Sequence, residues 1–195
     1  MPYFSKERAE IRKRIHALLS HKERVIVAID GRCASGKTTL AKSLAHDLSV
    51  PYVSCDDFFL PLEKRTPERL AAIGGNMERE RLFSEVLAPF LRGDTVSYRP
   101  FICKTLSYGD SVLLPQSRIL IVEGAYACHN ELWDHYDLHI LLTVSPEEQK
   151  KRILKRNPHN ANDFFTKWIP MEEGYLKKSR LIQEAEIILG SESLQ

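Results

Sequence analysis

The sequence of 195 residues lacks the features that mark several specialised classes of protein. Its four cysteines lie far apart and form no C-x-x-C pair, which argues against a disulfide framework or a zinc site and predicts free thiols in a reducing cytoplasm. No apolar run approaches the length of a membrane span, and no apolar segment follows the charged residues near the start, so we expect neither membrane insertion nor secretion. The net charge of +2 is almost balanced, which argues against a dedicated nucleic-acid binder.

The composition suits an ordinary globular domain. Hydrophobic residues make up 43% of the chain, which is enough for a proper core, and there is no internal repeat, low-complexity tract or strong linker. We therefore expect a single domain over residues 1–195.

Apolar runs alternate with segments of helical spacing along the chain. Strands are expected at 25–29, 51–55, 118–122, 138–144 and 185–189, and a small edge strand or hairpin arm at 95–99. Helices are expected at 5–20, from the end of the glycine-rich stretch to about 48, and at 78–91, 146–156 and 164–178, the last with a break at Pro170; residues 60–76 are expected to be irregular. This alternation predicts an α/β fold of three layers, with a mostly parallel five-stranded sheet between two layers of helices.

The most informative stretch runs from Asp30 to Thr39 and reads D-G-R-C-A-S-G-K-T-T. It matches the phosphate-binding pattern G-x-x-x-x-G-K-[ST] and lies where a strand turns into a helix, as that pattern requires. Glycines let the backbone N–H groups curl around phosphate oxygens at the positive end of the helix dipole. The residues predicted to bind a nucleotide are Gly31, Ala34, Ser35, Gly36, Lys37, Thr38 and Thr39.

Acidic residues follow two other predicted strands. Since ligands of parallel sheets bind at the carboxyl ends of the strands, we expect the phosphate loop, Asp56, Asp57 and Glu123 to meet at one edge. Lys37 would neutralise the β- and γ-phosphates, and Thr38 and Glu123 would hold Mg²⁺, although Glu123 could also be a simple carboxylate at a strand end. The pair Asp56 and Asp57 suggests one carboxylate that takes a proton from an acceptor hydroxyl and a second acid near the metal.

A basic cluster occupies the predicted helix 146–156. Arg152 and Arg156 are four residues apart and so share one helical face, from which they could neutralise charge in the transition state if this segment closes as a lid. The alternative is a solvated helix face with no catalytic part.

These residues together resemble the uridine kinase-like family of P-loop small-molecule kinases, which is related to phosphoribulokinase and bacterial pantothenate kinase. The resemblance covers most of the chain. Besides the phosphate loop, it rests on D-D-F-F at 56–59, G-N-M-E-R-E-R at 75–81, S-Y-R-P-F at 97–101, V-E-G-A-Y at 122–126 and R-I-L-K-R at 152–156. It implies a P-loop kinase domain with a lid near 150–170, ATP and Mg²⁺ as cofactors, and Asp56 as the catalytic carboxylate. Many members of the family have serine at the position of Asp57.

The resemblance also implies where the phosphate acceptor binds. Tyr98 is similar to a family tyrosine that holds a pyrimidine together with a histidine five residues later, but here the later residue is Cys103, and Arg99 adds a positive charge. Asp56, Tyr98 and Arg99 are therefore the predicted acceptor-binding residues, with a nucleoside such as uridine as the provisional acceptor and an anionic metabolite as the alternative.

The expected partner is thus a small-molecule phosphate acceptor, with neither nucleic acid nor membrane, and a homo-oligomer is left open. A regulatory GTPase would need an N-K-x-D signal, which the sequence lacks. An ATP-binding module that hydrolyses ATP in response to a protein partner is the remaining alternative.

Overall fold

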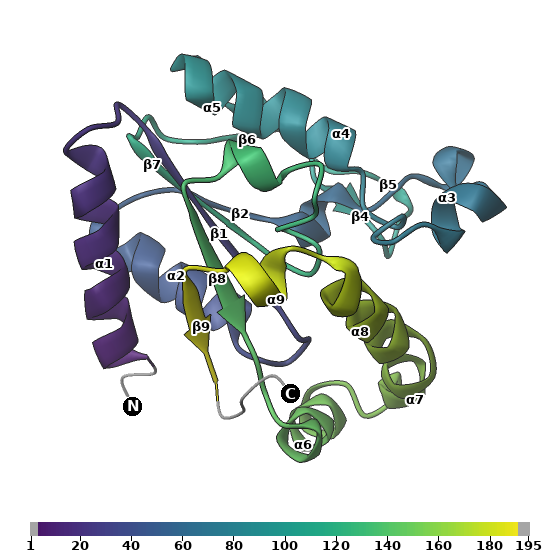
Figure 1. Ribbon diagram of the computed structural model, residues 1–195. Helices are drawn as coiled ribbons and strands as arrows, with labels where there is room; N and C mark the ends of the chain where they lie inside the picture. Colours follow the sequence, from purple (N-terminus) through teal and green to yellow (C-terminus); the bar gives the residue numbers. More distant parts are fainter. Residues whose placement is uncertain (1–3, 191–195) are drawn as a thin grey trace.

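A computed structural model describes residues 4–190, and the expected domain of 1–195 extends beyond them at both ends. Its centre is the five-stranded parallel sheet that the sequence predicts, and the structure gives its strand order as β2-β7-β1-β8-β9 (Figure 1). The strands are β1 (Val25–Gly31), β2 (Tyr52–Ser54), β7 (Ile119–Glu123), β8 (Leu138–Leu142) and β9 (Ile187–Leu189). Every residue of β1, β7 and β8 is buried, which explains why these strands are nearly continuous apolar runs in the sequence.

Helices cover both faces of this sheet and form two separate hydrophobic cores. On one face lie α1 (Ser5–Leu19) and α2 (Lys37–Leu48), which bury Ile11, Ile15, Leu40 and Leu44 against the strands. The elements on the other face are α4 (Arg79–Leu82), η3 (Phe83–Leu87), α5 (Ala88–Arg92), η4 (Trp133–His135), α8 (Ile169–Lys178) and α9 (Leu181–Glu184). The predicted three-layer α/β architecture is confirmed.

Two of the expected helices contain a π-helical turn directly before a proline. The helix expected at 78–91 is α4, the π turn η3 and α5, in which Pro89 lies in the first turn after η3. The helix expected at 164–178 is the π turn η5 (Phe164–Trp168) followed by α8, with Pro170 in the first turn of α8. The widened turn accommodates a residue that has no N–H to donate, so the chain stays helical where a break at Pro170 was expected.

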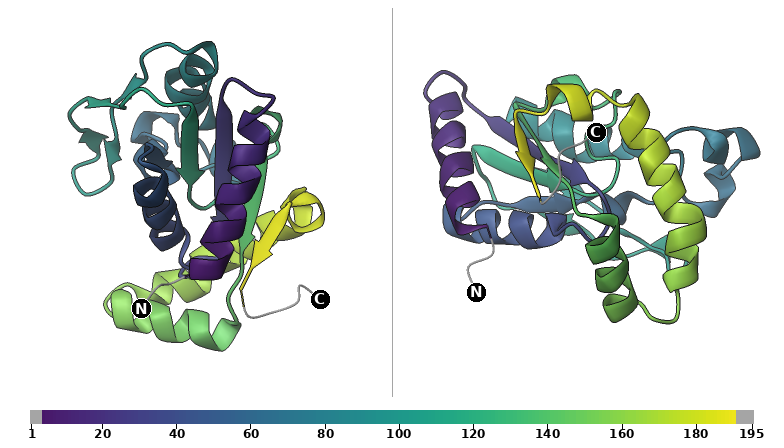
Figure 2. Two further views of the ribbon diagram at one scale, coloured as in Figure 1. Left: turned by 90° about the vertical axis from the view of Figure 1, so that its left-hand side faces the viewer. Right: turned by 60° about the horizontal axis from the view of Figure 1, so that its bottom comes forward.

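A helical segment lies beyond the carboxyl ends of the strands (Figure 2). It begins with α6 (Pro146–Arg156), whose bounds match the prediction because Ser145 caps it by accepting from the Glu148 N–H and Pro146 occupies its first turn. The short helix α7 (Ala161–Asp163) overlaps the end of the loop expected at 157–162. No helix between residues 4 and 190 is both long enough and apolar enough to cross a bilayer.

The segments between β2 and β7 form a smaller lobe. It contains the 3₁₀ turns η1 (Cys55–Phe58) and η2 (Leu62–Lys64) and the short helix α3 (Pro67–Ala71), the last two inside the region expected to be irregular. Two antiparallel pairs follow: β3 (Ser97–Tyr98) with β6 (Val112–Leu113), and β4 (Phe101–Ile102) with β5 (Ser107–Tyr108). The strand expected at 95–99 is therefore present as β3, whereas the pair β4–β5 has no counterpart in the prediction.

Candidate active site

The phosphate loop joins the end of β1 to the start of α2. Gly31 has a φ of +128°, and a Cβ there would lie 2.0 Å from the Leu142 carbonyl oxygen, so no side chain fits where β1 passes β8. Gly36 has a φ of +107° and immediately precedes α2. The backbone between them can take the cradle conformation that the sequence pattern predicts.

Lys37 lies across its own loop. Its ammonium donates to the carbonyl oxygens of Gly31 at 2.6 Å and Arg32 at 3.0 Å. These bonds hold a positive charge at the mouth of the loop, where the negative charge of a triphosphate would arrive.

Glu123, the last residue of β7, accepts hydrogen bonds from two hydroxyl groups on neighbouring elements. Thr38 Oγ1 lies 3.2 and 3.1 Å from its two carboxylate oxygens, and Ser54 Oγ donates at 2.8 Å. Glu123 is only 2% exposed, and burial raises its pKa while the bond from Ser54, the charge of Lys37 and the bond from Thr38 oppose the rise. The structure thus brings together two of the three predicted metal ligands.

This oxygen cluster fits Mg²⁺. Magnesium prefers hard oxygen ligands and, in nucleotide sites, takes only one or two from the protein, the rest being phosphate oxygens and water. Among residues 4–190 no group of three or more His, Cys, Asp or Glu side chains is arranged to hold a metal by itself. Thr38 and Glu123 are therefore suited to a metal that arrives with a nucleotide.

An open cleft of about 1350 Å³ runs from the phosphate loop between the small lobe and the α6–α8 segment. The predicted site residues that line it are Ala34, Ser35, Gly36, Lys37, Thr38, Thr39, Asp56, Glu123, Arg152 and Arg156. Four other predicted site residues, Gly31, Asp57, Tyr98 and Arg99, are not part of its lining.

The two neighbouring aspartates of η1 have different surroundings. Asp56 is exposed and lines the cleft, and its backbone N–H donates to Ser54 Oγ at 3.4 Å. The carboxylate of Asp57 instead accepts from the hydroxyl of Tyr98 at 2.9 Å. Partial burial raises the pKa of Asp57, with the Tyr98 bond acting against it. The metal role predicted for Asp57 stays a prediction, and its observed partner is Tyr98.

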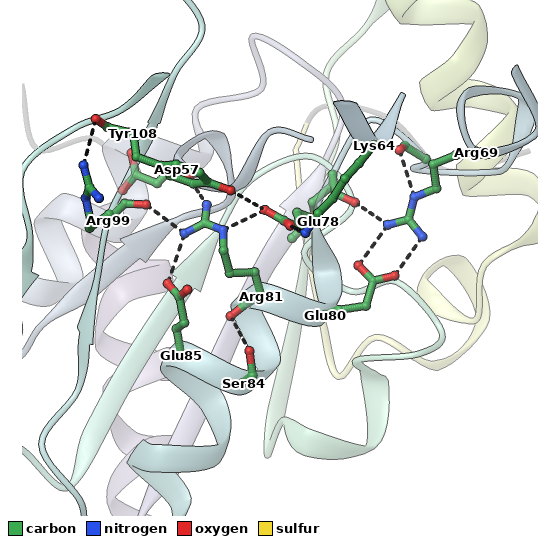
Figure 3. A network of polar contacts seen from close by, with 12 residues as sticks. Asp57, Lys64, Arg69, Glu78, Glu80, Arg81, Ser84, Glu85, Arg99 and Tyr108 are labelled. Carbon is green, nitrogen blue, oxygen red and sulfur yellow. Dashed lines mark hydrogen bonds and ion pairs between the residues drawn. The ribbon is translucent and has the colours of Figure 1, made fainter. Parts of the chain in front are cut away.

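Arg99 extends along the hairpin β4–β5. Its Nε donates to the Gly109 carbonyl at 2.8 Å and its Nη2 to the Tyr108 carbonyl at 3.3 Å (Figure 3). The Arg99 guanidinium is thus bonded to carbonyl groups of the hairpin and does not line the cleft. Its observed contacts stabilise the hairpin.

No functional role was predicted from the sequence for Arg81, whose side chain links η1 to the start of this hairpin (Figure 3). The Arg81 side chain is 9% exposed and donates to Glu78 Oε2 at 2.7 Å, to the Asp57 carbonyl at 2.9 Å and to the Arg99 carbonyl at 2.7 Å. Its guanidinium also lies 4.4 Å from the centre of the Phe58 ring. The only signal was the charge pattern of the predicted helix, which places acidic residues three before and four after Arg81.

The basic face of α6 borders the phosphate loop. Arg152 Nη1 donates to the Ala34 carbonyl at 3.0 Å, and its Nε donates to Glu148 Oε1 at 2.9 Å. Arg156 lines the same cleft, as do Lys151, Lys155 and Lys167. The face of α6 that carries Arg152 is thus directed toward the loop.

Two residues of helix α8, Glu172 and Tyr175, form hydrogen bonds with the phosphate loop and with Asp30 before it. The sequence did not predict these contacts. Asp30, 1% exposed, accepts from the Gly31 N–H at 2.6 Å, from the Cys128 N–H at 2.8 Å and from the Tyr175 hydroxyl at 2.7 Å. Glu172 accepts from the Cys33 N–H at 2.8 Å. The only hint in the sequence was the pair of acids at 172 and 173 in a helix with apolar neighbours.

Comparison with known proteins gives two different results. No family model matches the sequence, and no curated protein matches it either. Solved structures do match over nearly their full length. A possible uridine kinase from Bacillus stearothermophilus is 21% identical with a TM-score of 0.64, and the match covers 92% of this chain and 99% of that one.

A second solved structure is a candidate fructose transport system kinase from Silicibacter sp. TM1040. It is 22% identical with a TM-score of 0.73, and the match covers 93% of this chain and 98% of that one. Identities this low show a shared fold rather than a shared substrate. The chain therefore has the α/β fold of P-loop kinases, with its phosphate loop at the carboxyl end of the central strand β1.

Proposed function

We propose that the protein is an ATP-dependent phosphotransferase that moves the γ-phosphoryl group of ATP to a hydroxyl of a small molecule. The observation that carries this proposal is that Asp56 lines the same cleft as the phosphate loop and as the pair Thr38 and Glu123. Phosphoryl transfer requires mainly positioning and neutralisation of charge, and this cleft offers both.

The phosphate loop binds the triphosphate. Its N–H groups surround the phosphate oxygens, and Lys37 leaves the carbonyls of Gly31 and Arg32 to contact the β- and γ-phosphates. Mg²⁺, when bound, neutralises charge on the phosphate oxygens. Thr38 and Glu123 are the residues that hold it, the second through water or directly.

Asp56 orients the acceptor hydroxyl and takes its proton. The hydroxyl oxygen forms a bond to the γ-phosphorus as the bond from that phosphorus to the β-bridging oxygen breaks, and the leaving group departs as ADP. The proton ends on the Asp56 carboxylate. The exposure of Asp56 to the cleft supports this role, whereas the Asp57 carboxylate is bound to Tyr98.

Arg152 and Arg156 act from the lid. Arg152 already contacts the phosphate loop through the Ala34 carbonyl, which supports a role for it near the phosphates. Both arginines neutralise charge that develops as the phosphoryl group is transferred.

The four cysteines are free thiols, which supports a protein that works in a reducing cytoplasm.

ADP release by the purified protein with ATP and Mg²⁺ tests the proposal. The panel of acceptors begins with uridine and cytidine, which the family resemblance suggests, and continues with other nucleosides, pantothenate and sugar phosphates. We expect at least one of these hydroxyl compounds to stimulate ADP release and to appear as its phosphate ester. Stimulation by a protein and by no metabolite would instead identify an ATP-binding module.

A further inference from the structure

We propose that the phosphate acceptor is an anion whose carboxylate or phosphate group pairs with Arg65. This inference rests on the proposed phosphotransferase function and narrows its substrate class. It replaces Arg99 with Arg65 as the residue that selects a negatively charged acceptor.

Arg65 ends the turn η2 and lines the cleft that Asp56 also lines. Its Nε donates to the Leu60 carbonyl at 2.7 Å, which fixes the direction of the side chain. Within residues 4–190, neither of its Nη groups donates to another residue, and it forms no ion pair. A held guanidinium whose two Nη groups form one free edge matches the paired oxygens of a carboxylate or phosphate.

Three other arginines of the small lobe have carboxylate partners, whereas Arg99 binds the carbonyl groups of its own hairpin. Arg69 pairs with Glu80 at 2.8 Å, Arg79 with Glu131 at 3.1 Å and Arg81 with Glu78 at 2.7 Å; the first and third pairs are drawn in Figure 3. A half-buried charge is costly without a counter-charge, and these three ion pairs supply one. Arg65 departs from it at the wall of the cleft, where a ligand can supply the missing anion.

The thiol of Cys103 is influenced by the charges of both Arg65 and Asp56. The thiol lines the same cleft, at the position where the family resemblance led us to look for a base-reading histidine. Burial raises the pKa of Cys103, the positive charge of Arg65 lowers it and the negative charge of Asp56 raises it. Arg65, Cys103 and Asp56 line one cleft, in which one small molecule can present an anionic group to Arg65 and a hydroxyl to Asp56.

The walls of the cleft are partly apolar. Phe59, Leu106 and Tyr126 line it together with the polar groups. Such walls exclude water and strengthen the attraction between Arg65 and an anion. The same walls suit a compact organic acid or a sugar phosphate, in which a short carbon frame separates the hydroxyl from the charge.

Matched pairs of acceptors test this proposal. ADP release is measured with pantothenate against panthenol, glycerate against glycerol, and ribose 5-phosphate against ribose, with uridine as the neutral nucleoside. We expect kcat/KM for the anionic member of the productive pair to exceed that of its neutral partner by about tenfold or more. Arg65→Gln should remove this preference by raising KM for the acceptor while leaving KM for ATP unchanged.

Two further variants make the result specific. Arg92→Gln removes an exposed arginine that pairs with Asp94 and does not line the cleft, and it should behave as the wild type. Arg99→Gln should keep the preference for the anion, and its loss in that variant would overturn the choice of Arg65. A rise in KM for ATP alone in Arg65→Gln would place this guanidinium on the nucleotide and also contradict the proposal.

Equilibrium binding separates this inference from the proposed function. Each acceptor is titrated into the protein saturated with a non-hydrolysable ATP analogue and Mg²⁺. Binding of an anionic member that Arg65→Gln weakens about tenfold supports the inference even without turnover. Turnover with neutral acceptors only, or no binding of any anion, overturns the inference. If the wild-type protein binds an anionic acceptor but no acceptor stimulates ADP release, only the phosphotransferase function is overturned.

Discussion

The hydroxyl of Thr38 donates to both carboxylate oxygens of Glu123, at 3.2 and 3.1 Å. This contact joins the first turn of α2 to the end of β7, two elements 85 residues apart in the chain. It places a hydroxyl of the first turn of α2 beside the carboxylate at the end of β7, so that one cation could bind both. The proposed metal site depends on this relationship.

Glu123→Gln should therefore weaken the response to magnesium. An amide carries no charge to hold Mg²⁺, so we expect kcat to fall about 10²-fold and more magnesium to be needed for half-maximal rate. Initial rates measured across a magnesium series test this. Ser54→Ala removes only a hydrogen bond to the same carboxylate and should have a much smaller effect. Equal magnesium dependence in Glu123→Gln and the wild type would exclude Glu123 from the metal site.

Removal of the Arg152 guanidinium tests the lid. Arg152→Gln should lower kcat by about 10²-fold with little change in the affinity for ATP, because charge neutralisation is needed mainly in the transition state. Lys150→Gln is the matched control, since Lys150 lies on the same helix but is exposed and outside the lining of the cleft. Steady-state kinetics of both variants test this prediction. Similar kcat values for Arg152→Gln and Lys150→Gln would mean that α6 presents only a solvated basic face.

Arg81 should act by positioning the turn that carries Asp56. Arg81→Gln leaves the buried Glu78 with Lys64 as its remaining ion-pair partner, and we expect a loss of about 2 kcal/mol in the free energy of unfolding, measured by urea denaturation. Glu78→Gln combined with Arg81→Gln should restore part of it, because the buried carboxylate that has lost one of its two cationic partners is then removed as well. A double variant no more stable than the single one would show that the buried charge is not the cause.

The pKa of Glu172 is raised by its burial against the phosphate loop, while the charge of Lys37 and the Cys33 N–H oppose the rise. Above the ordinary value of 4.5 the unfolded chain loses this proton first, so the group's contribution to stability is present below that pH and is lost as pH rises through the folded pKa. Glu172→Gln removes the effect. Melting temperatures from pH 4.5 to 8 should show the variant gaining on the wild type as pH rises; a constant difference would contradict this.

The features that were predicted correctly from the sequence are those specified by residues close together in the chain. The phosphate loop is a local pattern, and the bounds of α6 follow from Ser145, Pro146 and the acids of the first turn. The sheet follows from apolar runs that are buried along their whole length. In each case the physical cause lies within a few residues of the element it specifies.

The features that it missed depend on contacts between distant segments. Cys33 and Glu172 are 139 positions apart, and no local pattern shows that α8 holds the loop. Whether Arg65 or Arg99 reaches the cleft depends on the pairing of β4 with β5, whose carbonyl groups bind Arg99. The different directions of Asp56 and Asp57 follow from the turn η1 and from Tyr98, which lies 41 positions later.

The most direct test of the account is the turnover of Asp56→Asn with the acceptor found in the panel. The amide keeps the size of the side chain but cannot take the proton, so we predict nearly unchanged ATP binding and a fall in kcat of about 10²- to 10⁴-fold. Activity that survives in Asp56→Asn and disappears in Asp57→Asn would contradict the assignment of the base and the mechanism built on it.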